Sequence, residues 1–189
     1  MKTPLGGVNA LYPSLTVIAG ALVQGKPNFN CIAHVGIMNY GQTHLISLSM
    51  AKVHYTNEGI LANRSFSVNI PSRTMVAQAD YVGLVSGKKT DKSQMFEVFY
   101  GKLESAPMIS ACPVCMECQL ERVVDFETHD LFVGKIVETY ADPGVLTGNQ
   151  VDPAKVDPLL FDMGTMSYYG IGPCLAKCWN IGKSLKNQE

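Results

Sequence analysis

The sequence predicts a mainly β protein, an all-β barrel or sandwich with a few short helices. Three observations support this class. Short apolar runs rich in β-branched residues dominate the first 70 positions. Each run is bounded by Gly, Pro or Asn, which are common in the turns between strands. Helix signals occur in only two segments, residues 56–63 and 72–85.

The first half of the chain contains most of the expected strands. Thr16–Val23 is an apolar, β-branched run, and Gln24–Asn28 has the composition of a turn. Three more short runs are expected to be strands: Cys31–Met38, His44–Met50 and Ser65–Ile70.

Two helices are expected to interrupt these strands. Thr56–Asn63 begins with a residue type that caps helices and carries the acid Glu58 in its first turn. The second helix runs from Ser72 to about Val85 and ends before Gly87. Its apolar residues recur at helical spacing, at Met75, Val76, Ala79 and Val82.

The second half begins with two long strand signals. Val114–Phe126 and Leu131–Tyr140 are expected to be strands joined at residues 127–130. A looser stretch rich in Asp and Pro follows, up to Asp162. The tail Tyr168–Lys186 returns to apolar sequence interrupted by Gly.

Composition limits the partners of the chain. A net charge of −1 over 189 residues gives no reason to expect nucleic acid or an anionic membrane as a partner. With 47% hydrophobic and 16% charged residues, the surface retains apolar area, which favours an oligomer. The apolar run Leu15–Val23 is interpreted as a buried strand rather than an export signal, and no run is long enough to span a membrane. A cytoplasmic protein with reduced thiols is expected.

Three of the six cysteines, Cys112, Cys115 and Cys118, have C-x2-C-x2-C spacing. On a strand, Met116, Cys118 and Leu120 share one face, so Cys115 points away from Cys118. This geometry favours buried thiols. Two alternatives stay open: redox-active thiols, or a metal or iron–sulfur site whose fourth ligand is Cys31, Cys174 or Cys178.

Two other segments have features of an anion-binding site. Three lysines, Lys88, Lys89 and Lys92, follow the end of the second helix, although cations are also favoured at helix ends without any ligand. The segment His54–Thr56 opens a helix directly after a strand, next to Lys52, and the free N–H groups at a helix start bind phosphate.

Seven pieces of the sequence, in order, resemble the flavin reductase-like family with the FMN-binding split β-barrel, a Greek-key barrel, which includes the flavoredoxins. The resemblance covers about residues 10 to 185 and rests on their order and spacing. The pieces are Tyr12-Pro13, GKPN (Gly25–Asn28), HLISLSMAKVHYT (His44–Thr56), SFSVNIPS (Ser65–Ser72), DYVGLVSGKKTDK (Asp80–Lys92), PVCMEC (Pro113–Cys118) and HDLFVG (His129–Gly134). In this family the position of Cys118 holds a strand cysteine with no metal role, so no metal ligand is expected here.

The resemblance implies FMN as the cofactor. FMN requires N–H groups, hydroxyls and cations for its phosphate, and backbone amides for the edges of its flat ring. The expected phosphate residues are Ser49, Lys52, Tyr55, Thr56 and Lys92, and the expected ring residues are Cys31, Ile32, Ala33, Ser47, Leu48, Ser49 and Met50. Asn28, Ser86 and Gly87 are also expected to contact the cofactor. His129 is the candidate for contact with the flavin or an incoming nicotinamide, unless it is only a turn residue. The chain departs from the family at Cys31–Ala33, where Thr or Ser is common, at His34, and at Lys88, where Arg is common.

Two functions remain open from the sequence. The first is an NAD(P)H-dependent oxidoreductase that reduces flavin or another small acceptor by way of FMN. The second is a flavoredoxin-like electron carrier with tightly bound FMN, reduced by a partner protein. A flavin store or metal-binding protein without turnover is a weaker third class. The resemblance also implies a homodimer, with FMN near the interface between the subunits.

Overall fold

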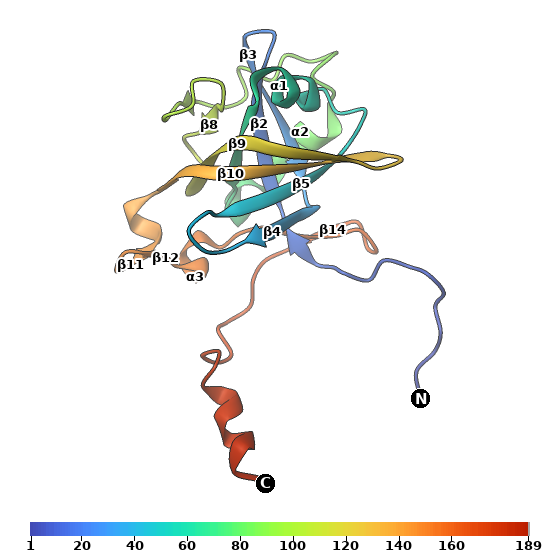
Figure 1. The fold of residues 1–189 in the computed structure, drawn as a ribbon, viewed down its shortest axis with the longest axis vertical. Coiled ribbons are helices and arrows are strands. Elements are labelled where there is room, and N and C mark those ends of the chain that lie inside the picture. Colours follow the sequence, from blue (N-terminus) through green and yellow to red (C-terminus); the bar gives the residue numbers. More distant parts are fainter. Residues whose placement is uncertain (189) are drawn as a thin grey trace.

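The computed structural model describes residues 1–188; Glu189, the last residue of the single domain expected over residues 1–189, lies outside the described residues. In the described part, seven strands form one antiparallel sheet in the order β3-β2-β6-β9-β10-β5-β4 (Figure 1). The expectation of a mainly β protein with short helices is confirmed. The strand bounds are β2 Val17–Val23, β3 Lys26–Ile32, β4 Val35–Asn39, β5 Leu45–Ala51, β6 Ser65–Ile70, β9 Val114–Asp125 and β10 His129–Ala141.

The sheet is curled, and the chain connectivity shows why. Its two edge strands, β3 and β4, are separated in the chain by only Ala33 and His34. A flat sheet of this width would hold its edges about 29 Å apart, because neighbouring strands lie about 4.8 Å apart. The three peptide steps from Ile32 to Val35 span at most about 11 Å. The edges therefore approach each other at this corner, where the Ser49 amide donates to the His34 carbonyl at 2.9 Å.

This corner corrects one sequence prediction. Cys31–Met38 was expected to be a single strand, but β3 ends at Ile32 and β4 begins at Val35. At Ala33 and His34 the chain passes from one edge strand of the sheet to the other. The sequence from Cys31 to Met38 is a continuous run of strand-forming residues, so it does not reveal this break. The predicted turn Gln24–Asn28 is also shorter. Val23 pairs with Lys26, and Gln24 and Gly25 both have positive φ, as in the tight hairpin turns that match the twist of a sheet.

The helices lie where they were expected. Helix α1 (Thr56–Asn63) connects β5 to β6 and packs on β2, and α2 (Val76–Leu84) packs on β3 after a 3₁₀ turn, η1 (Arg73–Met75). The capping role expected for Thr56 is wrong. Tyr55 occupies the cap position, without a side-chain cap, and the Thr56 hydroxyl instead accepts a hydrogen bond from Asn28 Nδ2 at 2.8 Å.

Shorter elements complete the fold. Strands β13 (Leu160–Asp162) and β14 (Ser167–Tyr169) form a hairpin that pairs with β1 (Ser14–Leu15). No helix among residues 1–188 is long and apolar enough to cross a membrane. The remaining elements are β7 Val98–Phe99, β8 Met108–Ile109, η2 Pro143–Val145, β11 Leu146–Thr147, β12 Gln150–Val151, α3 Pro153–Val156 and η3 Ile181–Gln188.

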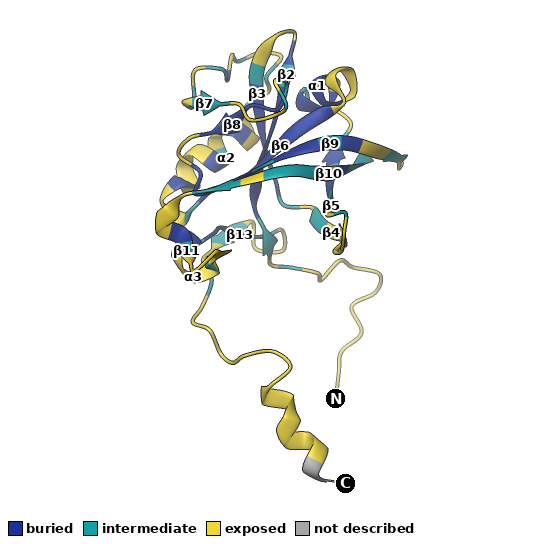
Figure 2. Ribbon diagram, turned by 60° about the vertical axis from the view of Figure 1, so that its left-hand side comes forward, coloured by how far each residue is buried: buried dark blue, intermediate teal, exposed yellow. Residues whose placement is uncertain are grey.

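Most residues of the central strands are buried (Figure 2). Their apolar side chains belong to two clusters, one on each face of the sheet. Inside the barrel, Val17, Phe66, Cys118 and Phe132 belong to one cluster. On the outer face, β3 and α2 enclose a second cluster that includes Cys115. The prediction that Cys115 and Cys118 face opposite sides of their strand is therefore confirmed.

Burial also determines the chemistry of the central cysteines. Cys112, Cys115 and Cys118 are free thiols and buried, and burial raises the pKa of each, to about 12 for Cys115. Protonated, buried thiols are weak nucleophiles and poor metal ligands. Among residues 1–188, no group of three or more His, Cys, Asp or Glu side chains is arranged to hold a metal ion.

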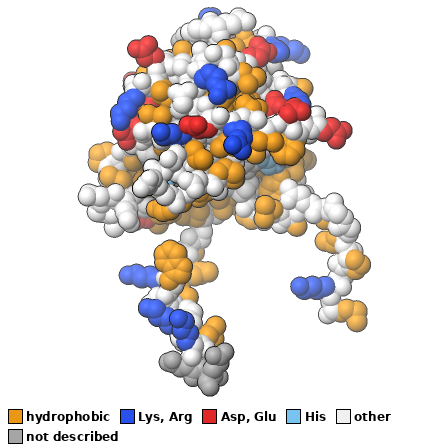
Figure 3. Space-filling view, viewed as in Figure 1, with side chains coloured by type: hydrophobic (Ala, Val, Ile, Leu, Met, Phe, Trp, Pro, Cys, Tyr) orange, Lys and Arg blue, Asp and Glu red, His pale blue; other side chains and the backbone are white. Residues whose placement is uncertain are grey.

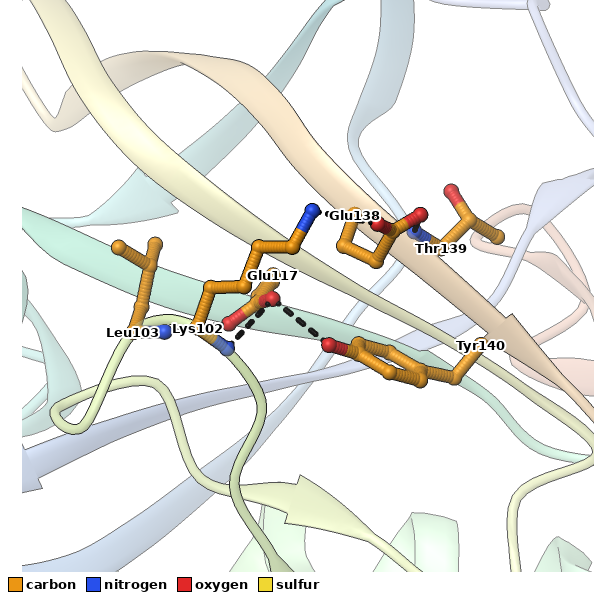
Figure 4. Close-up of polar contacts among 6 residues, drawn as sticks. All are labelled: Lys102, Leu103, Glu117, Glu138, Thr139 and Tyr140. Carbon is orange, nitrogen blue, oxygen red and sulfur yellow. Dashed lines mark hydrogen bonds and ion pairs between the residues drawn. The ribbon is translucent and has the colours of Figure 1, made fainter.

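A buried carboxylate fixes the loop after β7 to the sheet. Glu117, on β9, is fully buried. Its Oε1 accepts hydrogen bonds from the Lys102 amide at 2.9 Å and the Tyr140 hydroxyl at 3.0 Å, and its Oε2 accepts one from the Leu103 amide at 2.7 Å (Figure 4). At the surface above it, Lys102 forms an ion pair with Glu138 at 2.7 Å.

Candidate functional site

Two adjoining pockets form one groove along the corner where β3 passes into β4. The histidine pocket, with a volume of about 330 Å³, lies between the end of β3, α2 and the β13–β14 hairpin and contains His34, His54 and His129. The lysine pocket, with a volume of about 280 Å³, lies between the start of α1 and the loop after α2 and contains Lys92. Both pockets include His54, Gly83 and Leu84, so they adjoin each other.

Histidine side chains define the open end of the histidine pocket. His34 Nε2 lies 2.8 Å from the Tyr12 hydroxyl, and the His34 and His129 rings are 5.8 Å apart between centroids. Burial, and then repulsion from His129, lowers the pKa of His34. Burial also lowers the pKa of His54. Neutral imidazoles beside an apolar wall suit a flat aromatic ligand.

The opposite wall of the histidine pocket holds Cys31, Asp80 and Tyr168. The Tyr168 hydroxyl donates to Asp80 Oδ1 at 3.1 Å and lies 4.0 Å from Cys31 Sγ. Burial raises the pKa of Cys31 to about 11 and also raises that of Tyr168. Both groups therefore keep their protons at neutral pH.

The lysine pocket has one buried cation. Lys92 is 3% exposed, and its Nζ donates to the Phe29 carbonyl at 2.8 Å and the Val82 carbonyl at 2.6 Å. These bonds use two of its three N–H donors, which leaves one for a ligand. Burial lowers the pKa of Lys92 to about 8, because the charged form loses hydration.

The structure brings most of the expected residues to the groove. His129, with its Nδ1 2.8 Å from the Thr128 hydroxyl, lies at the histidine pocket. That pocket is also lined by the expected residues Cys31, Ile32, Ala33 and Ser49, and the lysine pocket by Asn28, Tyr55, Thr56, Ser86, Gly87 and Lys92.

Lys52 does not reach the groove, and its expected role is corrected. Its ammonium pairs with Asp125 and lies 3.9 Å from Asp130, both at the β9–β10 hairpin. The bond to Asp125 raises the pKa of Lys52. Two carboxylates repel a phosphate, and Lys52 lines neither pocket.

Three residues of β5 also stay outside the groove. Leu48 and Met50 are buried in the barrel core, opposite Phe132 and Asp130 of β10. Ser47 lies in the apolar mouth of the barrel, where β5 pairs with β4. Because β5 lies between β4 and β10, its backbone at these positions pairs with strands instead of a ligand.

The sequence did not identify several groove residues. Asn30 is two positions after Asn28 on β3, and the alternation of a strand places both on one face, so this signal was available. Thr16, Phe161 and Tyr168 reach the groove from distant parts of the chain, and no local pattern marks them.

Unpartnered buried polar atoms favour a ligand that can form hydrogen bonds in the groove. Thr16 Oγ1, His54 Nδ1 and Asn30 Nδ2 are buried and have no hydrogen-bond partner among residues 1–188, and all three residues line the groove. A buried polar atom without a partner costs about 1–3 kcal/mol, so a ligand that bonds to it is favoured. A flat ring in the histidine pocket and a phosphate beside Lys92 would match these donor sets, which is the chemistry of FMN.

The family of the chain follows from comparison with known proteins. Residues 11–169 match the family model described as "Flavin reductase like domain". The chain belongs to this flavin reductase-like family and has its split-barrel fold.

Two solved structures resemble the whole chain. Flavoredoxin from Methanosarcina acetivorans is 40% identical, with 98% of this chain and 99% of that one covered and a TM-score of 0.94. Flavoredoxin of Desulfovibrio vulgaris (Miyazaki F) is 32% identical, with 96% and 100% covered and a TM-score of 0.88. An uncharacterised protein of Archaeoglobus fulgidus is 27% identical over 135 residues, which are 70% of this chain and 75% of that protein.

Proposed function

We propose that this protein is an FMN-binding oxidoreductase, with the isoalloxazine ring in the histidine pocket and the phosphate in the lysine pocket. The observation that carries the proposal is the pair of adjoining pockets, with their unpartnered buried atoms and the buried cation of Lys92. Bound FMN would supply the redox chemistry. The chain would hold the ring, exclude water from one face and neutralise the phosphate.

The open end of the histidine pocket favours a small reactant. His34 and His129 flank space that a nicotinamide or a small acceptor would enter next to the ring. We therefore infer NAD(P)H-dependent reduction of flavin or another small acceptor, with His129 in contact with the ring or the nicotinamide. Residues 1–189 would form one flavin reductase-like domain, in a cytoplasmic homodimer.

A second candidate is a flavoredoxin-like electron carrier with tightly bound FMN that receives electrons from a partner protein. Identities of 40% and 32% over nearly the whole chain to two flavoredoxins favour it. Anaerobic mixing of the FMN-loaded protein with NADH or NADPH separates the two candidates. Rapid bleaching of the flavin supports the reductase, whereas an unchanged spectrum that dithionite then bleaches supports the carrier. A protein that fails to take up FMN on titration contradicts both.

Replacement of Lys92 by Ala is expected to weaken FMN binding by about ten- to a hundredfold, since one charge-assisted hydrogen bond contributes roughly 1.5–3 kcal/mol. Riboflavin, which lacks the phosphate, should bind the variant nearly as well as it binds the native protein. Lys52→Ala is the matched control and should leave both affinities unchanged, because Lys52 pairs with Asp125 outside the groove. Isothermal titration calorimetry of the native protein and both variants with each flavin measures the six dissociation constants, and equal loss for both flavins would place the phosphate elsewhere.

FMN affinity is expected to fall as the pH rises above about 8. The pKa of Lys92 is lowered to about 8, so the free protein loses this positive charge near that pH, and the phosphate binds the charged form. Affinity should then decrease by up to about tenfold per pH unit, until the pKa of Lys92 in the complex is reached. Fluorescence titration from pH 7 to 10 tests this slope, and Lys92→Ala should remove it. An identical slope in the variant would assign the effect to another group.

A further inference from the structure

The apolar side chains of the C-terminal tail, residues 172–186, are not buried against the described part of their own chain. Every residue of this segment is exposed, and the tail leaves the body after β14 (Figures 1 and 2). Its large apolar side chains stand in solvent, with exposed fractions of 95% for Leu175, 92% for Trp179, 68% for Ile181 and 67% for Leu185. Such a cluster in solvent is unfavourable unless another surface covers it.

The body of the same protein has an apolar groove of matching character. The barrel mouth, a pocket of about 600 Å³, opens between β1, β4 and β5 and is lined by the inner residues of the sheet. Its lining contains no Lys, Arg, Asp or Glu. At its rim, Ile37 and Tyr40 are 76% and 86% exposed.

We propose that the barrel mouth of one subunit binds the C-terminal tail of a second copy of this chain. Charge supports this occupant: from Gly172 to Gly182 the tail carries a single charged residue, Lys177, and its other lysines, Lys183 and Lys186, follow. Figure 3 shows hydrophobic side chains along the tail, with Lys or Arg side chains beside them. An apolar segment with one charged residue thus faces an apolar groove lined by no Lys, Arg, Asp or Glu.

The area also suits a stable dimer. Burial of Trp179 hides about 150–250 Å², and burial of the three aliphatic side chains hides on the order of 100 Å² each. A two-fold dimer makes this contact twice, because each subunit offers both a tail and a groove. With the matching groove surface counted, the total is on the order of 2,000 Å², and stable specific interfaces bury about 1,200–2,000 Å². The N-terminal segment is a weaker occupant, since Asn9 and Leu11 already border another pocket of their own chain.

Trp179 is the only tryptophan of the chain, so its fluorescence reports the position of the tail. In the full-length protein at micromolar concentration, its emission is expected at the short wavelengths of a buried indole and should resist quenching by acrylamide. Ile37→Asp should shift the emission to the red and restore quenching, because it places a charge in the groove. Ile37 is exposed, so the change should leave the fold of the subunit intact, as circular dichroism can verify. Phe126→Asp, at an exposed site on the β9–β10 hairpin, is the control and should change neither signal.

Mixing of two variants then tests whether the tail binds the groove of the second copy or that of its own chain. An excess of Trp179→Phe protein, with an intact groove, is added to Ile37→Asp protein. Return of the blue-shifted emission supports docking into the other subunit, and its absence contradicts it. A dimer by light scattering with an exposed Trp179 would overturn the tail inference but leave the proposed homodimer standing, whereas a monomer would overturn both. None of these readouts depends on FMN.

Discussion

Gly87→Ala is expected to weaken FMN binding by about a hundredfold or more, while the protein stays folded. A Cβ at this position would lie 2.1 Å from Asn28 Oδ1 and 2.8 Å from a ring carbon of Tyr55. Asn28 is buried and donates to the Thr56 hydroxyl, so it cannot move away without loss of that bond. The added methyl would displace two walls of the lysine pocket at once. Loss of one or two charge-assisted hydrogen bonds to the phosphate, at roughly 1.5–3 kcal/mol each, gives this magnitude.

Gly144→Ala is the matched control for this substitution. A Cβ at Gly144 meets nothing within 4 Å, so FMN affinity and thermal stability should equal those of the native protein. Calorimetric titration with FMN and with riboflavin completes the test, and riboflavin should lose much less affinity than FMN. If Gly87→Ala binds FMN as tightly as Gly144→Ala does, the phosphate does not lie in the lysine pocket.

The sequence predicted those parts of the fold that local patterns determine. Strand β6 and helix α1 have the expected bounds, because each is a short run with a clear stop on both sides. The division between β3 and β4 was missed. The break at Ala33 arises from the closure of the sheet, which is a property of seven strands together and leaves no local signature.

For the candidate site too, the sequence predicted only what a local motif determines. Ser86, Gly87 and Lys92 belong to one motif and lie together in the lysine pocket. Lys52 directly follows β5 and was expected at the phosphate, but it turns towards Asp125, more than 70 positions away in the chain. Tyr168 reaches the histidine pocket only because β13 and β14 pair with β1. Contacts between distant segments decide these cases, and composition or spacing does not encode them.

Glu117→Ala is expected to lower the free energy of unfolding by about 3–5 kcal/mol, since it leaves three hydrogen-bond donors without their charged acceptor. Those donors are the amides of Lys102 and Leu103 and the hydroxyl of Tyr140 (Figure 4). A loss of this size is a large fraction of the roughly 5–15 kcal/mol that stabilises a typical domain. Urea unfolding followed by circular dichroism measures it. FMN affinity should not change, because Glu117 lines neither pocket of the groove.

Glu138, a nearby carboxylate at the surface, tests whether the burial of Glu117 explains its contribution to stability. Glu138→Ala removes the partner of Lys102 at the surface, where solvent screens an ion pair and it contributes little to stability. Tyr140→Phe removes one of the three donors and should give an intermediate loss of about 1.5–3 kcal/mol. The expected order of stability is therefore Glu138→Ala, then Tyr140→Phe, then Glu117→Ala as the least stable. If Glu117→Ala is no less stable than Glu138→Ala, the loop after β7 is held by its apolar packing, and the buried carboxylate contributes little to the stability of the fold.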